Sequence, residues 1–222
     1  MASIPAVHLS ENSPHAKRTL TTGRAFPLGE LDRPKRTAAT PQGLTRIVRY
    51  LDVEVNARYA RTAENTFCNI YACDYCYLAG VYLPRVWWTT VALADLIAGR
   101  VVPVKYGSTV TELNANALYV WLRDFGPSFG WTRATSLDQL QSAANLGKVG
   151  VICAQRKLLN KPGHIAAVVP ESAAPQIAER CGTHIRLALQ SQAGMRNFCF
   201  SCQPGKWWQG AQFQAYGFWI HD

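Results

Sequence analysis

The chain is poor in acidic side chains, in methionine and in long apolar runs. It has 14 Asp and Glu against 23 Lys and Arg, which gives a formal net charge of +9, and two Met among 222 residues. Its apolar runs are short and broken by charge, so none reads as a membrane span. Residues 1–8 lack the basic and then apolar pattern of a standard signal peptide. We expect a chain that is made in the cytoplasm, does not insert into a membrane, and reaches any outside target by another route.

The scarcity of acidic groups suggests a polyanionic partner. Nucleic acid and the bacterial cell wall are the two leading classes, although a merely soluble cationic protein has the same composition. Residues 1–42 are rich in Pro, Ser, Thr, Arg and Lys and show no sustained apolar period. We expect them to form a basic, flexible arm ahead of a single folded domain at residues 43–222.

Hydrophobic periodicity divides the domain into a helical part and a later β-rich part. Residues 136–145 are a clear helix, because Ser136 is a good cap and Gln139 stands three residues later. Helices that precede an antiparallel sheet predict the α+β class. The expected helices span 44–60, 68–80, 90–98, 112–124 and 136–145, and the expected strands span 149–155, 164–169 and 184–192, with a further strand in the aromatic tail 207–219.

One cysteine occupies a position that favours a nucleophile. Cys68 comes two residues after Thr66, which with Asn65 forms a pair of good helix caps, and Gly80 is the expected end of the helix. Backbone N–H groups converge at the start of a helix, and this positive end favours the thiolate form of a cysteine. Cys68 is therefore the candidate for covalent catalysis. Backbone N–H groups at the helix start, with Asn65 or Asn69, would form the oxyanion hole.

His164 is the best candidate for the base that such a thiol needs. It starts a predicted strand, and Gly163 before it allows a close approach. If the strand 184–192 runs antiparallel to that strand, its end lies beside His164. We expect Gln192 at this end to accept the Nδ1–H of His164 and so to fix its tautomer. Gln190 is the substitute for this role, and Asn197 is the third choice.

Two motifs resemble those of one protein family. Residues 66–74, Thr-Phe-Cys-Asn-Ile-Tyr-Ala-Cys-Asp, resemble the nucleophile motif of CHAP-like and NlpC-like papain-fold peptidoglycan hydrolases, and residues 163–169 resemble their strand that begins with Gly-His. The resemblance implies a papain-like fold, in which an N-terminal helical half with the nucleophile helix packs on a C-terminal antiparallel sheet. It carries over Cys68 as nucleophile and His164 as base. The chain departs at the third position, where many relatives use His, Asn, Asp or Glu and glutamine is the best residue available here.

The same resemblance implies a function. It implies a cysteine amidase or endopeptidase that cleaves amide bonds in peptidoglycan stem peptides through a thioester acyl-enzyme, without cofactor or metal. The chain is also similar to type VI secretion effectors and phage lysins, which implies delivery to the periplasm of a target cell or secretion by a non-Sec route. We expect a monomer with peptidoglycan as its partner, an immunity protein as inhibitor, and no nucleic acid. Trp87 with Trp88, and Trp207 with Trp208, place one ring on each face of a strand, so one ring of each pair would line a groove; Trp87 and Trp88 are the candidates for contact with the substrate.

The seven cysteines leave other interpretations open. Their odd number leaves at least one thiol, such as Cys68, outside any set of disulfides. Cys73 with Cys76, and Cys199 with Cys202, form two Cys-x-x-Cys pairs that fit a zinc site, while the spacing from Cys68 to Cys76 fits an iron–sulfur loop. We favour disulfides or buried thiols. Two other functions stay open: a basic, non-enzymatic module that binds wall or nucleic acid through zinc or disulfide staples, and a Cys/His acyltransferase or deamidase that acts on a protein.

Overall fold

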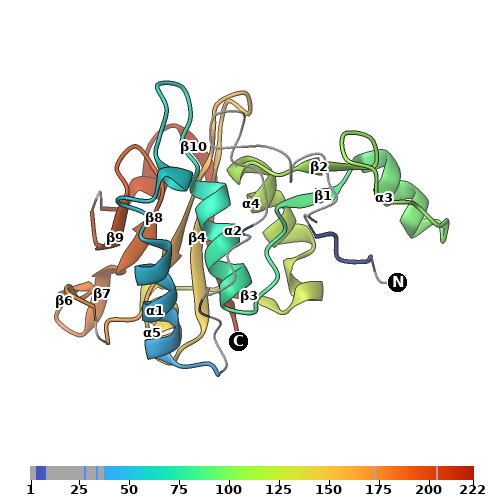
Figure 1. The fold of residues 1–222 in the computed structure, drawn as a ribbon. Coiled ribbons are helices and arrows are strands. Elements are labelled where there is room, and N and C mark those ends of the chain that lie inside the picture. Colours follow the sequence, from blue (N-terminus) through green and yellow to red (C-terminus); the bar gives the residue numbers. More distant parts are fainter. Residues whose placement is uncertain (1–3, 9–27, 29–33, 35–37, 173, 204) are drawn as a thin grey trace. The chain divides into compact units, whose positions relative to one another are not determined.

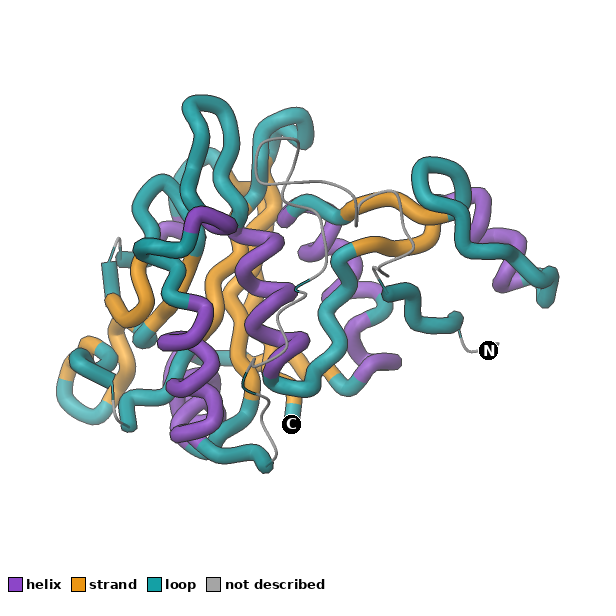
Figure 2. The backbone as a smooth tube through the Cα atoms, viewed as in Figure 1, coloured by secondary structure: helices purple, strands orange, loops and turns teal. Residues whose placement is uncertain are grey.

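The structure is a computed structural model that describes residues 4–8, 28, 34, 38–172, 174–203 and 205–222. The chain divides into two compact units, which can be followed in Figure 1 and Figure 2. The smaller unit comprises Met1–Gly29 and Pro84–Leu113, and the larger unit comprises Glu30–Leu83 and Asn114–Asp222. The sequence predicted one domain over 43–222, whereas residues 84–113 cluster with N-terminal residues. Most of the predicted arm lies outside the described residues.

The smaller unit contains a short antiparallel ribbon and one helix. Strand β1 (Val86–Trp88) pairs with β2 (Val110–Glu112), and α3 (Thr90–Ile97) lies between them in the chain. The side chain of Thr89 accepts a hydrogen bond from the N–H of Ala92 and so caps α3. The helix predicted over 90–98 is therefore confirmed.

Residues 4–8 of the predicted arm are held to this ribbon by hydrogen bonds. Trp88 Nε1 donates to the carbonyl oxygen of Pro5 at 2.9 Å. The hydroxyl of Tyr106 donates to the carbonyl oxygen of His8 at 2.7 Å. Val7 between them is buried. The described start of the arm is thus packed, where the sequence predicted a flexible segment.

The larger unit is built on a six-stranded antiparallel sheet with the strand order β3-β10-β4-β5-β8-β9. Strands β6 and β7 form a separate two-stranded ribbon. The strands are β3 (Trp131–Ala134), β4 (Val149–Arg156), β5 (His164–Val168), β6 (Glu179–Cys181), β7 (His184–Leu187), β8 (Gln190–Gln192), β9 (Phe198–Ser201) and β10 (Phe213–His221). The helices of this unit are α1 (Pro41–Leu51), α2 (Cys68–Leu78), α4 (Ala115–Asp124) and α5 (Leu137–Asn145).

Helices cover both faces of this sheet. Leu140 of α5 belongs to the same buried core as Ile152 of β4. The thiol of the next residue, Cys153, donates to the carbonyl oxygen of Ala115 at the start of α4, at 3.5 Å. Because successive side chains of a strand point to opposite faces, α5 and α4 lie on opposite sides of β4. The mixture of helices and antiparallel strands confirms the α+β class.

Two predicted elements are shorter than the sequence indicated. The helix expected over 44–60 ends at Leu51, because Asp52 adopts a left-handed conformation with φ 37° and its N–H donates to the carbonyl oxygen of Val48. The strand expected over 184–192 is split into β7 and β8. The reason is visible at Leu189, whose N–H donates to Oε1 of Gln141 on α5 at 2.8 Å and so is not available to a continuous strand.

The aromatic tail was predicted correctly as a strand but not in its extent. Trp207–Gln209 forms a 3₁₀ turn, and the strand begins only at Phe213. This strand, β10, pairs with both β3 and β4 and therefore lies inside the sheet. Among the described residues, no helix combines the length and the apolar composition that crossing a membrane requires.

Candidate active site

Helix α2 begins at Cys68, as the sequence predicted, and can be found in front of the sheet in Figure 1. Its cap is Phe67, which makes no side-chain capping bond, so the predicted capping by Asn65 and Thr66 is wrong. Phe67 thus leaves the N–H groups of the first turn to other partners, and the N–H of Asn69 acts on the thiol of Cys68. At the other end, Gly80 takes the left-handed conformation expected of a helix stop, with φ 73°.

His164 is the first residue of β5, and a close approach of the chain to itself fixes the position of this strand. A Cβ at Gly163 would lie 2.5 Å from Oδ1 of Asn116 and 2.7 Å from the carbonyl oxygen of Ala154. Only glycine fits at such distances. The sequence predicted that Gly163 permits a close approach, and the approaching groups are those of α4 and β4. His164 faces Ala154 across the β4–β5 pair.

The thiol of Cys68 and the imidazole of His164 form a hydrogen-bonded pair. Cys68 is only 4% exposed, and its burial by itself raises the pKa of the thiol. The charge of His164 and the hydrogen bond to it outweigh burial, so the pKa of Cys68 is lowered. Backbone N–H groups of Ile165 and Asn69 lower it further. Sequence reasoning missed the contribution of Ile165, which depends on how β5 passes the start of α2.

The interaction with Cys68 also changes the pKa of His164. Burial lowers the pKa of His164, but the charge of Cys68, the hydrogen bond to Cys68 and the hydrogen bond to Gln192 reverse this effect. The pKa of His164 is therefore raised above its ordinary value. A lowered thiol pKa beside a raised imidazole pKa favours the thiolate–imidazolium form, which is the reactive form of a nucleophilic cysteine.

Gln192 forms a hydrogen bond with the imidazole of His164. Its Oε1 lies 2.6 Å from Nε2 of His164, and its Nε2 donates to the carbonyl oxygen of Arg196 at 3.1 Å. Because the amide oxygen only accepts, Nε2 of His164 carries a proton and Nδ1 is left for the thiol. The sequence predicted the partner but the wrong nitrogen, because Gln192 meets Nε2 where Nδ1 was expected.

Gly194 leaves room for the contact between Gln192 and His164. A Cβ at Gly194 would lie 2.9 Å from Nε2 of Gln192 and 3.2 Å from Cε1 of His164. The N–H of Gly194 donates to Oδ1 of Asn197 at 3.0 Å. Nδ2 of Asn197 in turn donates to the carbonyl oxygen of Tyr59 at 3.0 Å. Asn197, the third choice as partner of His164, thus serves to position the turn after β8.

Gln190, the predicted substitute for Gln192, does not reach His164. It pairs with Val168, at the opposite end of β5. Its Oε1 accepts a hydrogen bond from Nε1 of Trp207 at 2.8 Å. The Trp207 ring meets the His164 ring edge to face, with 4.5 Å between centroids. Gln190 therefore acts on His164 only through Trp207, a residue that sequence reasoning placed on a strand.

Asn116 is a further residue that sequence reasoning did not place at the site. It is 5% exposed, on α4. Its Oδ1 accepts from the N–H of Arg156 at 2.9 Å, and its Nδ2 donates to the carbonyl oxygens of Leu159 at 3.3 Å and Lys161 at 2.9 Å. One buried amide thus fixes the loop that leads from β4 to His164. A lone Asn in a helix pattern gives no signal of such long-range bonds.

Three further residues were predicted to contact the oxyanion or the substrate. Asn65 is exposed, and its N–H donates to Oγ1 of Thr62 at 3.0 Å. Trp87 and Trp88 belong to the smaller unit, where both are buried. A stacking role for their rings stays a prediction.

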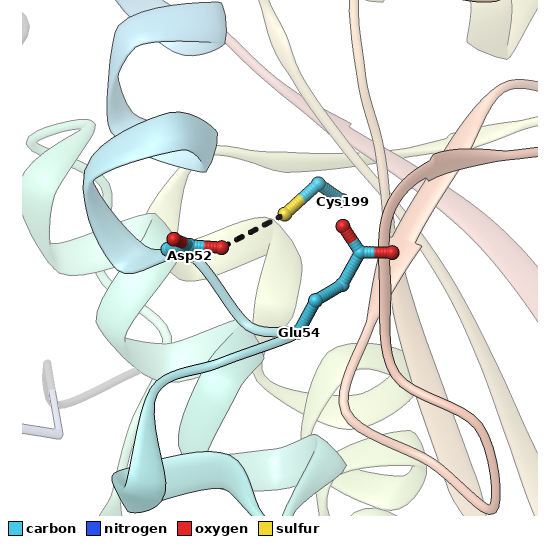
Figure 3. A group of neighbouring side chains, drawn as sticks. All are labelled: Asp52, Glu54 and Cys199. Carbon is cyan, nitrogen blue, oxygen red and sulfur yellow. Dashed lines mark hydrogen bonds between the residues drawn. The ribbon is translucent and has the colours of Figure 1, made fainter.

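None of the seven cysteines is in a disulfide. Asp52, Glu54 and Cys199 bring their ligand atoms within 4.8 Å of one another (Figure 3). Burial and the nearby charge of Glu54 raise the pKa of Cys199 to about 11, the opposite of the shift at Cys68. A closed zinc site needs four ligands, and Cys202 does not join this group. The structure therefore does not assemble the two Cys-x-x-Cys pairs into a common site.

A buried ion pair anchors the middle of α2. Asp74 accepts from Nε of Arg58 at 2.7 Å and from the hydroxyl of Tyr59 at 2.8 Å. The side chains of Arg58 and Asp74 are each 6% exposed. Burial and the charge of Asp74 raise the pKa of Tyr59, which keeps its hydroxyl a donor. These bonds fix the helix that carries Cys68.

The position of Gln192 leads to a first prediction. Gln192→Ala is expected to lower kcat by about 10–100-fold with little change in KM, because the imidazole loses the partner that fixes its proton on Nε2. Gln192→Glu keeps an acceptor and adds a charge, so the pKa of His164 should rise further and the alkaline limb of the rate profile should move to higher pH. Steady-state kinetics across pH would measure both. Unchanged kcat and pH profile in Gln192→Ala would contradict the positioning role.

No protein-family model and no curated protein matches the chain.

Proposed function

We propose that the protein is a cysteine amidase or endopeptidase with a papain-like arrangement, which cleaves amide bonds in peptidoglycan stem peptides. The observation that carries the proposal is the pairing of Cys68 at the start of α2 with His164 at the start of β5. Gln192 completes the set by holding Nε2 of His164. Acyl transfer by a cysteine needs a nucleophile, a base beside it and a third group that orients the base, and these three residues would fill those roles.

The residues support a two-step reaction. The Cys68 thiolate attacks the amide carbonyl carbon, and the oxygen takes up the negative charge. The start of α2 has no side-chain cap, so the N–H of Cys68 remains to stabilise that oxygen. The C–N bond then breaks while Nδ1 of the His164 imidazolium gives its proton to the leaving amine. In the second step, His164 takes a proton from water, the hydroxide attacks the thioester, and Cys68 leaves as thiolate.

The substrate class is supported by two features of the chain. The motifs at residues 66–74 and 163–169 resemble those of papain-fold peptidoglycan hydrolases. The net charge of +9 suits a wall whose peptides carry carboxylates. We propose that the protein acts on the wall of a target cell as an antibacterial effector or lysin, with an immunity protein as inhibitor in the producing cell.

Digestion of purified sacculi tests the function directly. Mass spectrometry of the released muropeptides should show cleaved stem peptides with one new amine and one new carboxyl group, and intact glycan linkages. Glycan cleavage, or no release by protein whose Cys68 reacts with iodoacetamide, would contradict the proposal. In the second case, loss of amide ammonia or acyl transfer on protein substrates would favour the deamidase or acyltransferase alternative.

The coupled pair predicts a characteristic pH dependence. The Cys68 pKa is lowered, so the thiolate is present from a pH below the ordinary thiol value of about 8.5. The His164 pKa is raised, so the imidazolium persists above the ordinary value of about 6.5. We expect a bell-shaped profile of kcat/KM whose acid limb reports the pair losing its thiolate and whose alkaline limb reports it losing its imidazolium. A rate that rises only above pH of about 8.5 would contradict the ion pair.

A further inference from the structure

A small basic pocket lies at the loop that leads into His164. It has a volume of about 170 Å³ and is lined by Arg156, Lys157, Leu158, Lys161 and Gln212. Three of these residues are cationic, one carries an amide, and none is acidic. In the described part of the chain, no acidic side chain forms an ion pair with any of the three cations. The pocket therefore presents uncompensated positive charge to whatever enters it.

The guanidinium of Arg156 is fixed before any ligand binds. Its Nε donates to the carbonyl oxygen of Pro162 at 2.9 Å, and its Cζ lies 5.1 Å from the centroid of the Phe213 ring. No protein group among the described residues accepts from its Nη1 or Nη2. The two outer nitrogens of a guanidinium match the two oxygens of a carboxylate. A ligand would thus meet a donor pair whose orientation has already been set.

The loop that forms the rim is fixed as well. Asn116 bonds to the N–H of Arg156 and to the carbonyl oxygens of Leu159 and Lys161, which hold both sides of the loop on α4. On the remaining side, the N–H of Lys157 donates to the carbonyl oxygen of Gln212 at 3.0 Å. The cations at the rim are therefore carried by a backbone that is tied at several points.

The pocket adjoins the catalytic histidine. Arg156 follows Ala154 by two residues on β4, and Ala154 is opposite His164, so alternation puts Arg156 on the side of the sheet that His164 occupies. The charge of Arg156 reaches His164, where it opposes the rise of the imidazole pKa. A continuous aromatic wall joins the two places, since Trp207 contacts both His164 and Phe213, with ring centroids 4.5 Å and 5.8 Å away.

We propose that this pocket is a subsite that binds a carboxylate of the substrate peptide beside the bond to be cleaved. The proposal rests on the proposed function for the nature of the substrate. Arg156 supplies a bidentate partner, Lys157 and Lys161 supply further positive charge, and Gln212 supplies an amide donor. The volume suits one short acidic side chain or chain end and is smaller than the roughly 300 Å³ at which drug-sized sites begin.

Binding to the inactive Cys68→Ala protein tests the subsite without any need for turnover. The probes are the dipeptide N-acetyl-L-alanyl-D-glutamate and its diamide, followed by calorimetry or by NMR shifts of the loop 156–163. The free acid should bind at least about tenfold more tightly than the diamide, and its affinity should fall with salt. Arg156→Gln/Lys161→Gln should abolish this preference. Equal binding of acid and diamide, or a preference that survives the double substitution, would overturn the proposal.

Kinetics with the active protein provide the second test. Arg156→Gln/Lys161→Gln should lower kcat/KM by about 10–100-fold on a stem peptide with free carboxylates and leave an amidated peptide with the same scissile bond unaffected. The control is Arg123→Gln/Lys148→Gln, which removes the same charge from the surface ion pairs with Asp124 and Asp222. An equal loss in the control would overturn the subsite. Carboxylate-selective binding together with uncut sacculi would support the subsite and contradict the proposed function.

Discussion

Cys68→Ala is expected to lower the rate of amide cleavage by at least about 10⁴-fold, because the acyl-enzyme cannot form without the sulfur. His164→Ala should cost a similar factor, since the thiol then loses both its base and the charge that lowers its pKa. The double variant should be little worse than either single one, because the two residues act as a unit. Release of soluble muropeptides from sacculi over time measures all three.

The free thiols of the chain supply a matched control for this prediction. Cys181→Ala removes an exposed thiol on β6 and should leave cleavage unchanged. Iodoacetamide at neutral pH should modify Cys68 faster than Cys199, whose pKa is raised to about 11. Peptide mapping by mass spectrometry would give the two rates. Wild-type cleavage by Cys68→Ala, with the protein still folded by circular dichroism, would end the assignment of the nucleophile.

Asp74→Ala is expected to lower the free energy of unfolding by about 3–5 kcal/mol, because it leaves the buried guanidinium of Arg58 without its counter-charge. The same substitution also takes the acceptor from the hydroxyl of Tyr59. Since the three residues anchor α2, we expect activity to fall as well, through displacement of the helix start. Urea unfolding followed by far-UV circular dichroism measures the change.

An exposed ion pair of the same unit gives the comparison. Asp124 pairs with Arg123 at 2.6 Å, with side chains 40% and 53% exposed. Asp124→Ala should therefore change the free energy of unfolding by at most about 1 kcal/mol. If Arg58→Met/Asp74→Leu restored most of the stability lost in Asp74→Ala, the cost would lie in the unpaired charge. A loss below about 1 kcal/mol in Asp74→Ala would contradict the buried anchor.

Local signals in the sequence predicted the parts of the site that depend on local structure. The start of α2 at Cys68, the stop at Gly80 and the Ser136 cap of α5 each depend on a few neighbouring residues. The antiparallel pairing that brings Gln192 near His164 followed from element order and the two-residue period of strands. These features needed no knowledge of distant contacts.

The missed features are set by contacts between residues far apart in the chain. Which ring nitrogen faces Gln192, Nε2 instead of the predicted Nδ1, depends on the orientation of the His164 ring. The edge-to-face contact of Trp207 with His164 depends on a 3₁₀ turn, where the sequence predicted a strand. The loop held by Asn116 depends on a helix some forty residues earlier. Propensity and periodicity report none of these relations, because they describe one element at a time.

The position of the base depends on the register in which β4 pairs with β5. His164 stands opposite Ala154, and a slip of one residue in this register would set Ile165 in its place. The slipped strand would still count as a strand by circular dichroism, yet the sheet would have no base beside the sulfur. Recovered cleavage after refolding therefore counts the molecules whose central sheet has formed in the correct register, which spectroscopic recovery of secondary structure does not distinguish.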